Sequence, residues 1–211
     1  MGSNVEYITV EKTTALEVDE KKSRFIGVVT HVEDQTAIND FLNSLKKANK
    51  DAKHIAYGYV LGKNFDIAKN NDDGEPAGTA GNPISQALAQ ANITDTMVAV
   101  VRYFGGIELG KPKLASTYFK TATEALKQAN KIRMANCSVF AMTVKYPDFV
   151  PVGTYLRDNH LPIIGADYGD VVSLRVAIPV PDIDKHLSEI KLKVGNDFMC
   201  SKTDSIYLKM D

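Results

Sequence analysis

The chain has 211 residues, of which 44% are hydrophobic, and its 25 basic and 26 acidic residues leave a net charge of −1. Overall charge therefore cannot drive binding to nucleic acid, which would need a local basic patch. No apolar run approaches the roughly 18 residues of a membrane span, and the first residues lack the pattern of a secretory signal. We expect a cytoplasmic protein with no membrane partner.

The first part of the chain predicts strands that alternate with helices. Residues 7–17 and 25–32 mix β-branched and apolar side chains and predict two strands. Asp34 is a suitable N-cap for a helix, because its carboxylate can accept a bond from the first turn. Another strand follows at residues 55–61, and a polar turn is expected near residues 70–71.

The middle of the chain predicts a buried strand between two helices. Asn82 and Pro83 indicate a helix start, with asparagine as the cap and proline in the first turn, and this helix should end near Asn92. Residues 97–103 form a continuous apolar run of strand length, which is typical of a central strand covered on both faces. Pro112 should open the longest helix, which carries an apolar stripe at helical spacing.

The last third of the chain predicts a second unit with the order βαββαβ, which is the ferredoxin-like arrangement. We expect strands at residues 139–146 and 206–210, a hairpin at residues 161–178, and helices after Pro147 and from Pro181. Because the long helix ends near Ala129, we expect two domains, residues 1–131 and 136–211. Cys137 and Cys200 have no C-x-x-C spacing, so two buried, reduced thiols are expected rather than a disulfide or a metal pair.

Residues 72–81 form the most informative segment, since they combine three carboxylates with three glycines, a proline and a threonine. Such a run has no face to bury, which is typical of a recognition loop. Asp72, Asp73 and Glu75 repel one another unless cations lie among them, and a divalent cation could bridge them to a phosphate. The alternative is that these residues only build turns and a helix cap.

A second segment, residues 100–106, ends an apolar strand with Arg102, two aromatic residues and two glycines, and we interpret the two segments as walls of one cleft. Arg102 stands at the end of its strand where ligands gather in open α/β sheets, so a ligand contact is favoured over a brace for the acidic loop. Phe104 is expected in the core, whereas Tyr103 could offer a stacking face. Lysines in the first turns of the long helix, where the dipole is already positive, would favour a visiting anion. These are Lys111, Lys113 and Lys120.

Taken in order and spacing, these segments resemble the Impact/YigZ family over nearly the whole chain. The motifs are Lys22–Ile26, His54 with Ala56-Tyr57, Asp72–Gly81, and Val101–Gly106 with Leu109-Gly110. One departure lies at residues 111–118, where a glycine-rich turn and an arginine of the family are replaced by lysines and small residues. Glycine-mediated anion binding is therefore not expected there, although Lys111 and Lys113 could supply the charge.

The resemblance implies an α+β fold of two domains. The first would be a βαβ domain like domain IV of elongation factor G and like a small-subunit ribosomal protein, and the second would be akin to a C-terminal domain of that factor. Eukaryotic members of the family regulate the activation of a stress kinase that acts on translation initiation. Fold analogy alone does not establish function, so the site must carry the argument.

We therefore expect a binding protein linked to translation, with RNA, the ribosome or a translation-associated protein as partner, no cofactor and no metal, and an oligomeric state left open. An enzyme is less favoured; the alternative is a metal-dependent enzyme acting on a phosphorylated or nucleotide substrate, and a third option is a purely protein-binding regulator. Histidines other than His54 are scattered without metal-ligand spacing. The expected ligand-binding residues are Arg24, His54, Asp72, Asp73, Glu75, Gly78, Thr79, Gly81, Arg102, Tyr103, Gly105, Gly106, Lys111 and Lys113.

Overall fold

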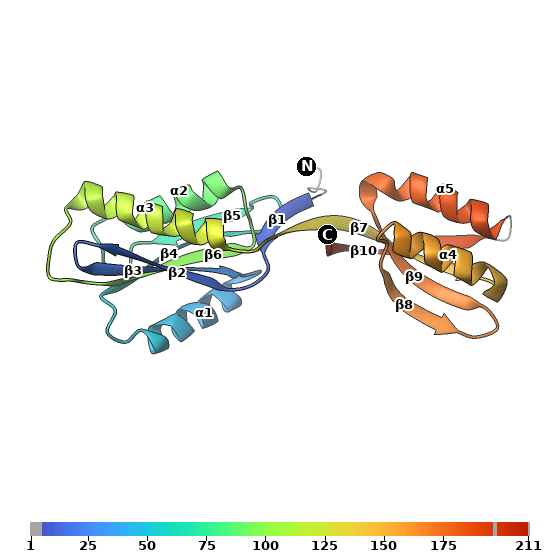
Figure 1. Ribbon diagram of the computed structural model, residues 1–211, viewed down its shortest axis with the longest axis horizontal. Coiled ribbons are helices and arrows are strands. Elements are labelled where there is room, and N and C mark those ends of the chain that lie inside the picture. The colour runs from blue at the N-terminus through green and yellow to red at the C-terminus, as the bar shows by residue number, and fades with distance from the viewer. Residues whose placement is uncertain (1–5, 196–197, 211) are drawn as a thin grey trace. The chain divides into compact units, whose positions relative to one another are not determined.

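The computed structural model describes residues 6–195 and 198–210 of the chain. The first residues, in which no secretory signal is expected, lie outside the described residues. The chain forms two compact units of mixed helices and strands, one reaching to Arg133 and the other running from Met134 to Met210 (Figure 1). Each unit has its own hydrophobic core. Among the described residues, no helix combines the length and the apolarity that crossing a bilayer requires.

The first unit is built on a five-stranded sheet in which all neighbours are antiparallel. Its strands, in spatial order, are β2 (Thr14–Glu20), β3 (Ser23–His31), β6 (Thr96–Tyr103), β4 (His54–Leu61) and β5 (Ile67–Asn71). The rule that ligands gather at the carboxyl ends of parallel strands therefore does not apply to Arg102, and its role must be judged from its contacts.

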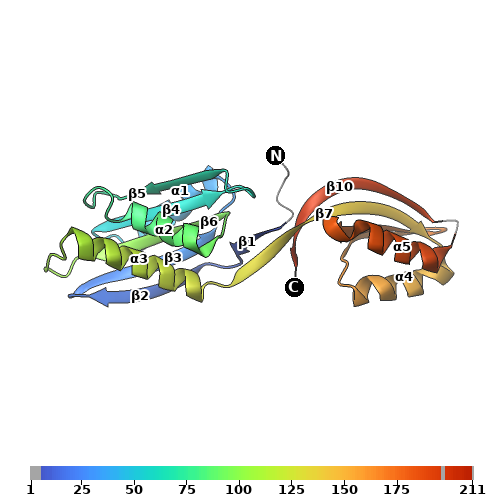
Figure 2. The ribbon, with the colours of Figure 1, turned by 90° about the horizontal axis from the view of Figure 1, so that it is seen from above.

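Helices cover both faces of this sheet. Helices α2 (Gly81–Ala91) and α3 (Lys111–Gln128) lie side by side on one face, and α1 (Gln35–Ala48) lies on the other (Figures 1 and 2). The expected cap of α1 is confirmed, since the Asp34 carboxylate accepts a bond from the backbone N of Ala37 at 2.7 Å.

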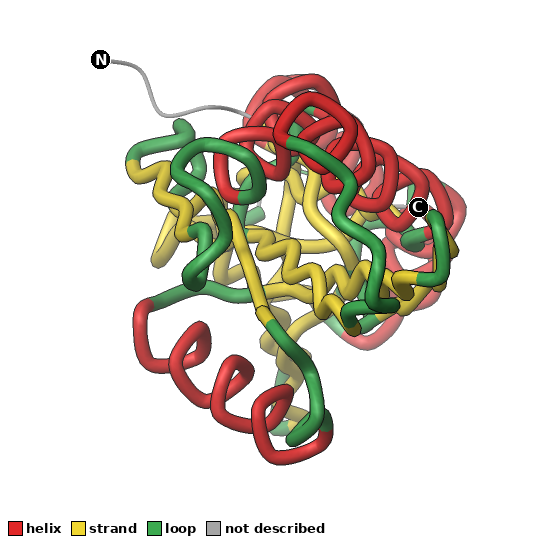
Figure 3. The backbone as a smooth tube through the Cα atoms, turned by 90° about the vertical axis from the view of Figure 1, so that its left-hand side faces the viewer, coloured by secondary structure: helices red, strands yellow, loops and turns green. Residues whose placement is uncertain are grey.

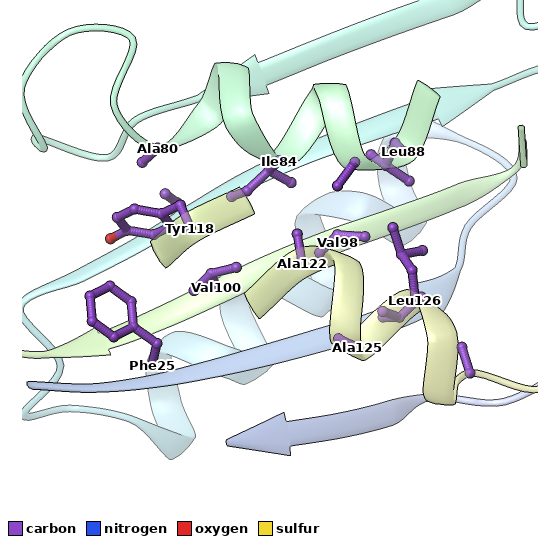
Figure 4. Packing of buried hydrophobic residues seen from close by; sticks show 14 of the residues in the cluster. Phe25, Ala80, Ile84, Leu88, Val98, Val100, Tyr118, Ala122, Ala125 and Leu126 are labelled. Carbon is purple, nitrogen blue, oxygen red and sulfur yellow. The ribbon is translucent and has the colours of Figure 1, made fainter. Parts of the chain in front are cut away.

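Strand β6 is the centre of the unit because both of its faces are buried. Val98 and Val100 belong to the core under α2 and α3, which Figure 4 shows together with Phe25 and Tyr118. Met97 and its alternate neighbours belong to the core under α1. The prediction of a central strand covered on both faces is confirmed.

Three local predictions are wrong. Residues 7–17 form two strands, β1 (Glu6–Val10) and β2, and not one. The expected polar turn at residues 70–71 is the end of β5. Helix α2 begins at Gly81, so Asn82 lies inside it. The reason is that the Asp72 carboxylate, from outside the helix, accepts bonds from the backbone N of Ala80 and Gly81 at 3.0 and 2.8 Å.

The second unit has the element order βαββαβ. Its elements are β7 (Lys131–Val144), α4 (Tyr146–Asp158), β8 (Ile163–Tyr168), β9 (Val172–Pro179), α5 (Ile183–Val194) after a 3₁₀ turn (Val180–Asp182), and β10 (Met199–Met210). The strands lie in the order β10-β7-β9-β8. Leu156 of α4, Leu174 of β9 and Ile190 of α5 share the core. Both cysteines are free thiols; Cys137 is buried as expected, whereas Cys200 is only half-buried.

Candidate functional site

The two segments singled out in the sequence meet at one end of the first unit's sheet, the end that faces the viewer in Figure 3. Together with the start of β4 they line one pocket of about 480 Å³. The lining residues are Lys53, His54, Glu75, Pro76, Arg102, Phe104, Glu108, Leu109, Gly110, Lys111 and Leu114. A larger hollow of about 600 Å³ lies on the sheet of the second unit. We take the smaller pocket as the candidate site because its wall contains a buried arginine and a buried carboxylate.

The floor of the pocket is a buried polar cluster centred on Glu75. Its Oε1 lies 2.6 Å from Nη1 of Arg102 and accepts a bond from the Tyr118 hydroxyl at 2.8 Å. Burial, followed by the negative charge of Glu75, raises the pKa of Tyr118 far above its ordinary value, so this hydroxyl stays a donor. Figure 4 shows Tyr118 on α3 above Phe25. The Glu75 carboxylate therefore links the acidic loop to strand β6 and to helix α3.

His54 is fixed beside this cluster in a defined tautomer. Its Nδ1 lies 2.6 Å from the carbonyl oxygen of Asp73, and a carbonyl only accepts, so Nδ1 carries the proton. Its Nε2 faces Glu75, with 3.9 Å between Nε2 and Oε2. In the sheet, His54 is the register partner of Arg102 across β4 and β6. The ring thus forms one wall of the pocket.

The three carboxylates of the acidic loop are each engaged by the chain itself. Asp72 accepts from three backbone N–H groups of residues 78–81, at 2.8 to 3.0 Å. Burial alone would raise its pKa, but these bonds outweigh burial and hold the pKa below its ordinary value. Asp73 Oδ2 accepts from the backbone N of Ile55 at 2.6 Å. Because Glu75 is held by Arg102, these carboxylates do not form a shared cation site.

No group of His, Cys, Asp and Glu side chains suited to a metal ion occurs in the part of the chain that the structure describes. Convergence of the three carboxylates around one ion would favour the metal-dependent enzyme, and the bonds above give each carboxylate a different partner. Thr79 is likewise internal to the loop, since its hydroxyl donates to the carbonyl of Pro76 at 2.6 Å.

Arg102 lies between two aromatic rings. Its Cζ is 5.4 Å from the ring centre of Phe25 and 5.6 Å from that of Phe104. The side chain is buried, yet its Nε has no hydrogen-bond partner among the described residues. Phe104 is 48% exposed, so the prediction that it belongs to the core is wrong. Phe25 already fills the core side of Arg102, and β6 ends one residue before Phe104.

Gly105 holds the segment after β6 against the turn between β2 and β3. A Cβ at this position would overlap the backbone carbonyl of Lys22, so only glycine fits. The Ser23 hydroxyl accepts a bond from the backbone N of Gly105 at 3.2 Å. Gly106 has φ of 83° and no neighbour within 4 Å of a Cβ among the described residues. Gly105 therefore has a structural role that the sequence interpretation did not assign.

Four of the expected site residues line the pocket: His54, Glu75, Arg102 and Lys111. Others lie outside it. Arg24 stacks on the Tyr103 ring, with its Cζ 4.3 Å from the ring centre, and Lys113 Nζ forms an ion pair with Glu20 at 2.7 Å. The remaining expected residues shape the loops, and they are Asp72, Asp73, Gly78, Thr79, Gly81, Gly105 and Gly106.

Sequence reasoning missed several residues at the site. Lys53 and Pro76 adjoin expected residues in the sequence, Glu108 lies between two of them, and all three line the pocket. The helical spacing places Tyr118 in the apolar stripe of the long helix and gives its hydroxyl no role. A tyrosine in a buried stripe usually forms a hydrogen bond through its hydroxyl, and this rule could have indicated a polar partner such as Glu75.

Residues 21–126 match the model of the Impact N-terminal domain. The chain belongs to the Impact family. It is 31% identical to the IMPACT family member YvyE of Bacillus subtilis (strain 168), over 82% of this chain and 79% of that protein. It is 33% identical to the IMPACT family member YigZ of Escherichia coli (strain K12), over 77% and 81% respectively. A crystal structure of a hypothetical protein superposes with a TM-score of 0.62 and 26% identity, over 95% of this chain and 98% of that one. The matched domain of this Impact family member contains every residue of the pocket.

Proposed function

We propose that this Impact family member is a translation-linked regulator that binds RNA, free or within the ribosome, at the pocket of its first unit. The observation that carries the proposal is the position of Phe104. Its half-exposed ring stands at the pocket beside exposed Lys53 and Lys111 and above the Arg102 guanidinium. Aromatic faces next to cations are the means by which proteins hold unpaired bases and their phosphates.

The charges around the pocket favour a local contact rather than a long-range one. Arg102 is offset by Glu75, whereas Lys53 and Lys111 are exposed and Glu108 is the further carboxylate at the pocket wall. With a net charge of −1 the whole chain does not attract RNA. Binding should therefore be moderate, involve few phosphates and show a shallow dependence on salt concentration.

The link to translation follows from the family resemblance, since eukaryotic members of the Impact family act on translational control. The ribosome and its RNAs present unpaired segments, which is the chemistry that an aromatic face and two lysines recognise. We also propose that the βαββαβ unit corresponds to the C-terminal domain of an elongation factor and contributes to binding of the same partner.

The test is RNA binding by the full chain, measured by fluorescence anisotropy with a labelled single-stranded RNA at two salt concentrations. Phe104→Ala should weaken binding by about five-fold or more, because base stacking on an aromatic ring contributes about 1–3 kcal/mol. Phe65→Ala is the matched control, since Phe65 is a similarly exposed phenylalanine outside the pocket. Equal affinity of Phe104→Ala and Phe65→Ala variants would refute the pocket as the RNA site. Crosslinking in cells, followed by sequencing of bound RNA, tests the link to the ribosome.

A further inference from the structure

The pocket contains the N-terminal end of the longest helix of the first unit. Helix α3 has 18 residues, and its N-cap, Gly110, has no side chain to bond the first turn. The first N–H groups of a helix have no partner inside the helix and carry its positive end. Gly110, Lys111 and Leu114 all line the pocket, so this end of α3 is part of its wall. This arrangement suits an anion.

An independent observation at the same pocket also indicates an anion. Arg102 is only 6% exposed, and its Nε–H has no partner among the described residues. A buried donor on a charged group without a partner is unfavourable, and Arg102 lines the pocket, so the pocket favours a ligand with oxygen acceptors. Its Nη1 is already bonded to Glu75, so this arginine is held in place before a ligand arrives.

The third element is an aromatic face at a suitable place. The Phe104 ring centre lies 5.6 Å from Cζ of Arg102, and the ring is half exposed at the pocket. A pocket of about 480 Å³ falls within the range of small-molecule sites, about 300–1,000 Å³. An anion-binding helix end beside a stacking face is complementary to a nucleotide, which joins a phosphate to a planar base.

We propose that this pocket binds a single nucleotide, with its phosphate at the N-terminus of α3 beside Lys111 and its base on Phe104. The proposal rests on the proposed function only in that RNA supplies the nucleotide in the cell. Glu108 lines the same pocket with a negative charge, so it opposes the phosphate and limits affinity. The ligand is therefore one unpaired nucleotide with an accessible phosphate, a narrower class than RNA in general.

The probes are adenosine 5′-monophosphate, adenosine and inorganic phosphate, titrated into the ¹⁵N-labelled full chain and followed by NMR. We expect the monophosphate to bind more tightly than either of the other two, and to shift the amide signals of Gly110 and Lys111. Lys111→Gln should weaken its binding by about two- to five-fold, and Glu108→Gln should strengthen it by about two-fold, as expected of exposed charges. Phe104→Ala should weaken both adenosine and the monophosphate.

Lys127→Gln is the matched control, since Lys127 lies in the last turn of the same helix, away from the pocket. If the monophosphate fails to bind, or if Lys111→Gln and Glu108→Gln behave like Lys127→Gln, the nucleotide pocket is refuted. RNA binding that survives in that case leaves the proposed function standing. Monophosphate binding without RNA binding would support the pocket and refute the RNA function.

Discussion

Glu75 and Arg102 form a buried ion pair, with 2.6 Å between Oε1 and Nη1, that fastens the acidic loop to the central strand β6. Both side chains are almost wholly buried, so little of either charge is open to water. Removing one member of such a pair leaves the other charge uncompensated. The arginine is therefore a brace for the loop, whatever further contact it makes with a ligand.

Replacing Arg102 with alanine should lower the free energy of unfolding by about 3–5 kcal/mol, because the buried Glu75 charge loses its partner. Arg24→Ala is the comparison, since Arg24 lies 3.8 Å from Glu17 with both side chains about half exposed, and should cost at most about 1 kcal/mol. Urea denaturation measures both. Similar values for the two variants would contradict the brace.

Tyr118→Phe removes one hydroxyl and keeps the ring that packs against Phe25, at 5.3 Å between ring centres. Because the hydroxyl donates to the charged Glu75, its loss should cost about 1.5–3 kcal/mol of stability. Thermal unfolding gives the change in Tm. RNA affinity should stay unchanged, since Tyr118 is not among the residues that line the pocket. A large loss of affinity at unchanged Tm would place Tyr118 at the ligand instead.

The fold should become less stable as the pH is lowered through the acid range, in part because of Asp72. Its pKa lies below the ordinary value of 3.8 in the folded chain, so the unfolded chain takes up the proton first. The contribution of Asp72 is complete above the unfolded pKa and is lost as the pH falls through the folded pKa. The stability difference between the wild type and Asp72→Asn should thus be largest near neutral pH and shrink below about pH 4. A constant difference across this range, measured by urea denaturation, would contradict the assignment.

Two neighbouring glycines should differ in their tolerance of a side chain. Gly105→Ala should disrupt folding, because the added methyl group overlaps the carbonyl of Lys22. Gly106→Ala meets open space and carries only the strain of a φ of 83°, about 1–2 kcal/mol. Yields of folded protein and Tm values distinguish them. Equal tolerance at both positions would show that the close approach to Lys22 is not required.

The proposed domain boundaries, residues 1–131 and 136–211, are tested by limited proteolysis. The protease should cut within residues 131–136 or nowhere. These residues belong to strand β7, so cutting should be slow. Preferred cleavage within residues 95–125 would contradict the division, since that range contains the central strand and most of α3.

The sequence was most informative where a single local rule determines the structure. The cap at Asp34, the strand at residues 96–103 that is buried on both faces and the start of α3 beside Pro112 depend on neighbours within one element, and all three are predictable. Asn82 looked like a cap for the same reason, but Asp72, ten residues earlier, supplies the bonds. When a distant carboxylate accepts the bonds of a helix's first N–H groups, the sequence at the helix start does not reveal it.

The site was predictable in its segments and less so in its contacts. The two segments meet because strands β5 and β6, which lie on either side of β4, run in the same direction and end at the same end of the sheet. That Glu75 and not Asp72 or Asp73 pairs with Arg102 depends on which carboxylates the loop backbone has already engaged. Hydrophobicity alone predicts burial for both Phe25 and Phe104, but only Phe25 lies in the core, and Phe104, which follows the end of β6, is half exposed.

The contact between Gly105 and the backbone of Lys22 links positions far apart in the sequence. Any insertion or deletion in the β2–β3 turn would displace the segment that carries Phe104, even though the turn itself does not line the pocket. A partner protein that binds the exposed turn would therefore be able to shift the position of the Phe104 ring. Sequence changes at residues 21–23 and at 104–106 should accordingly be selected as a pair.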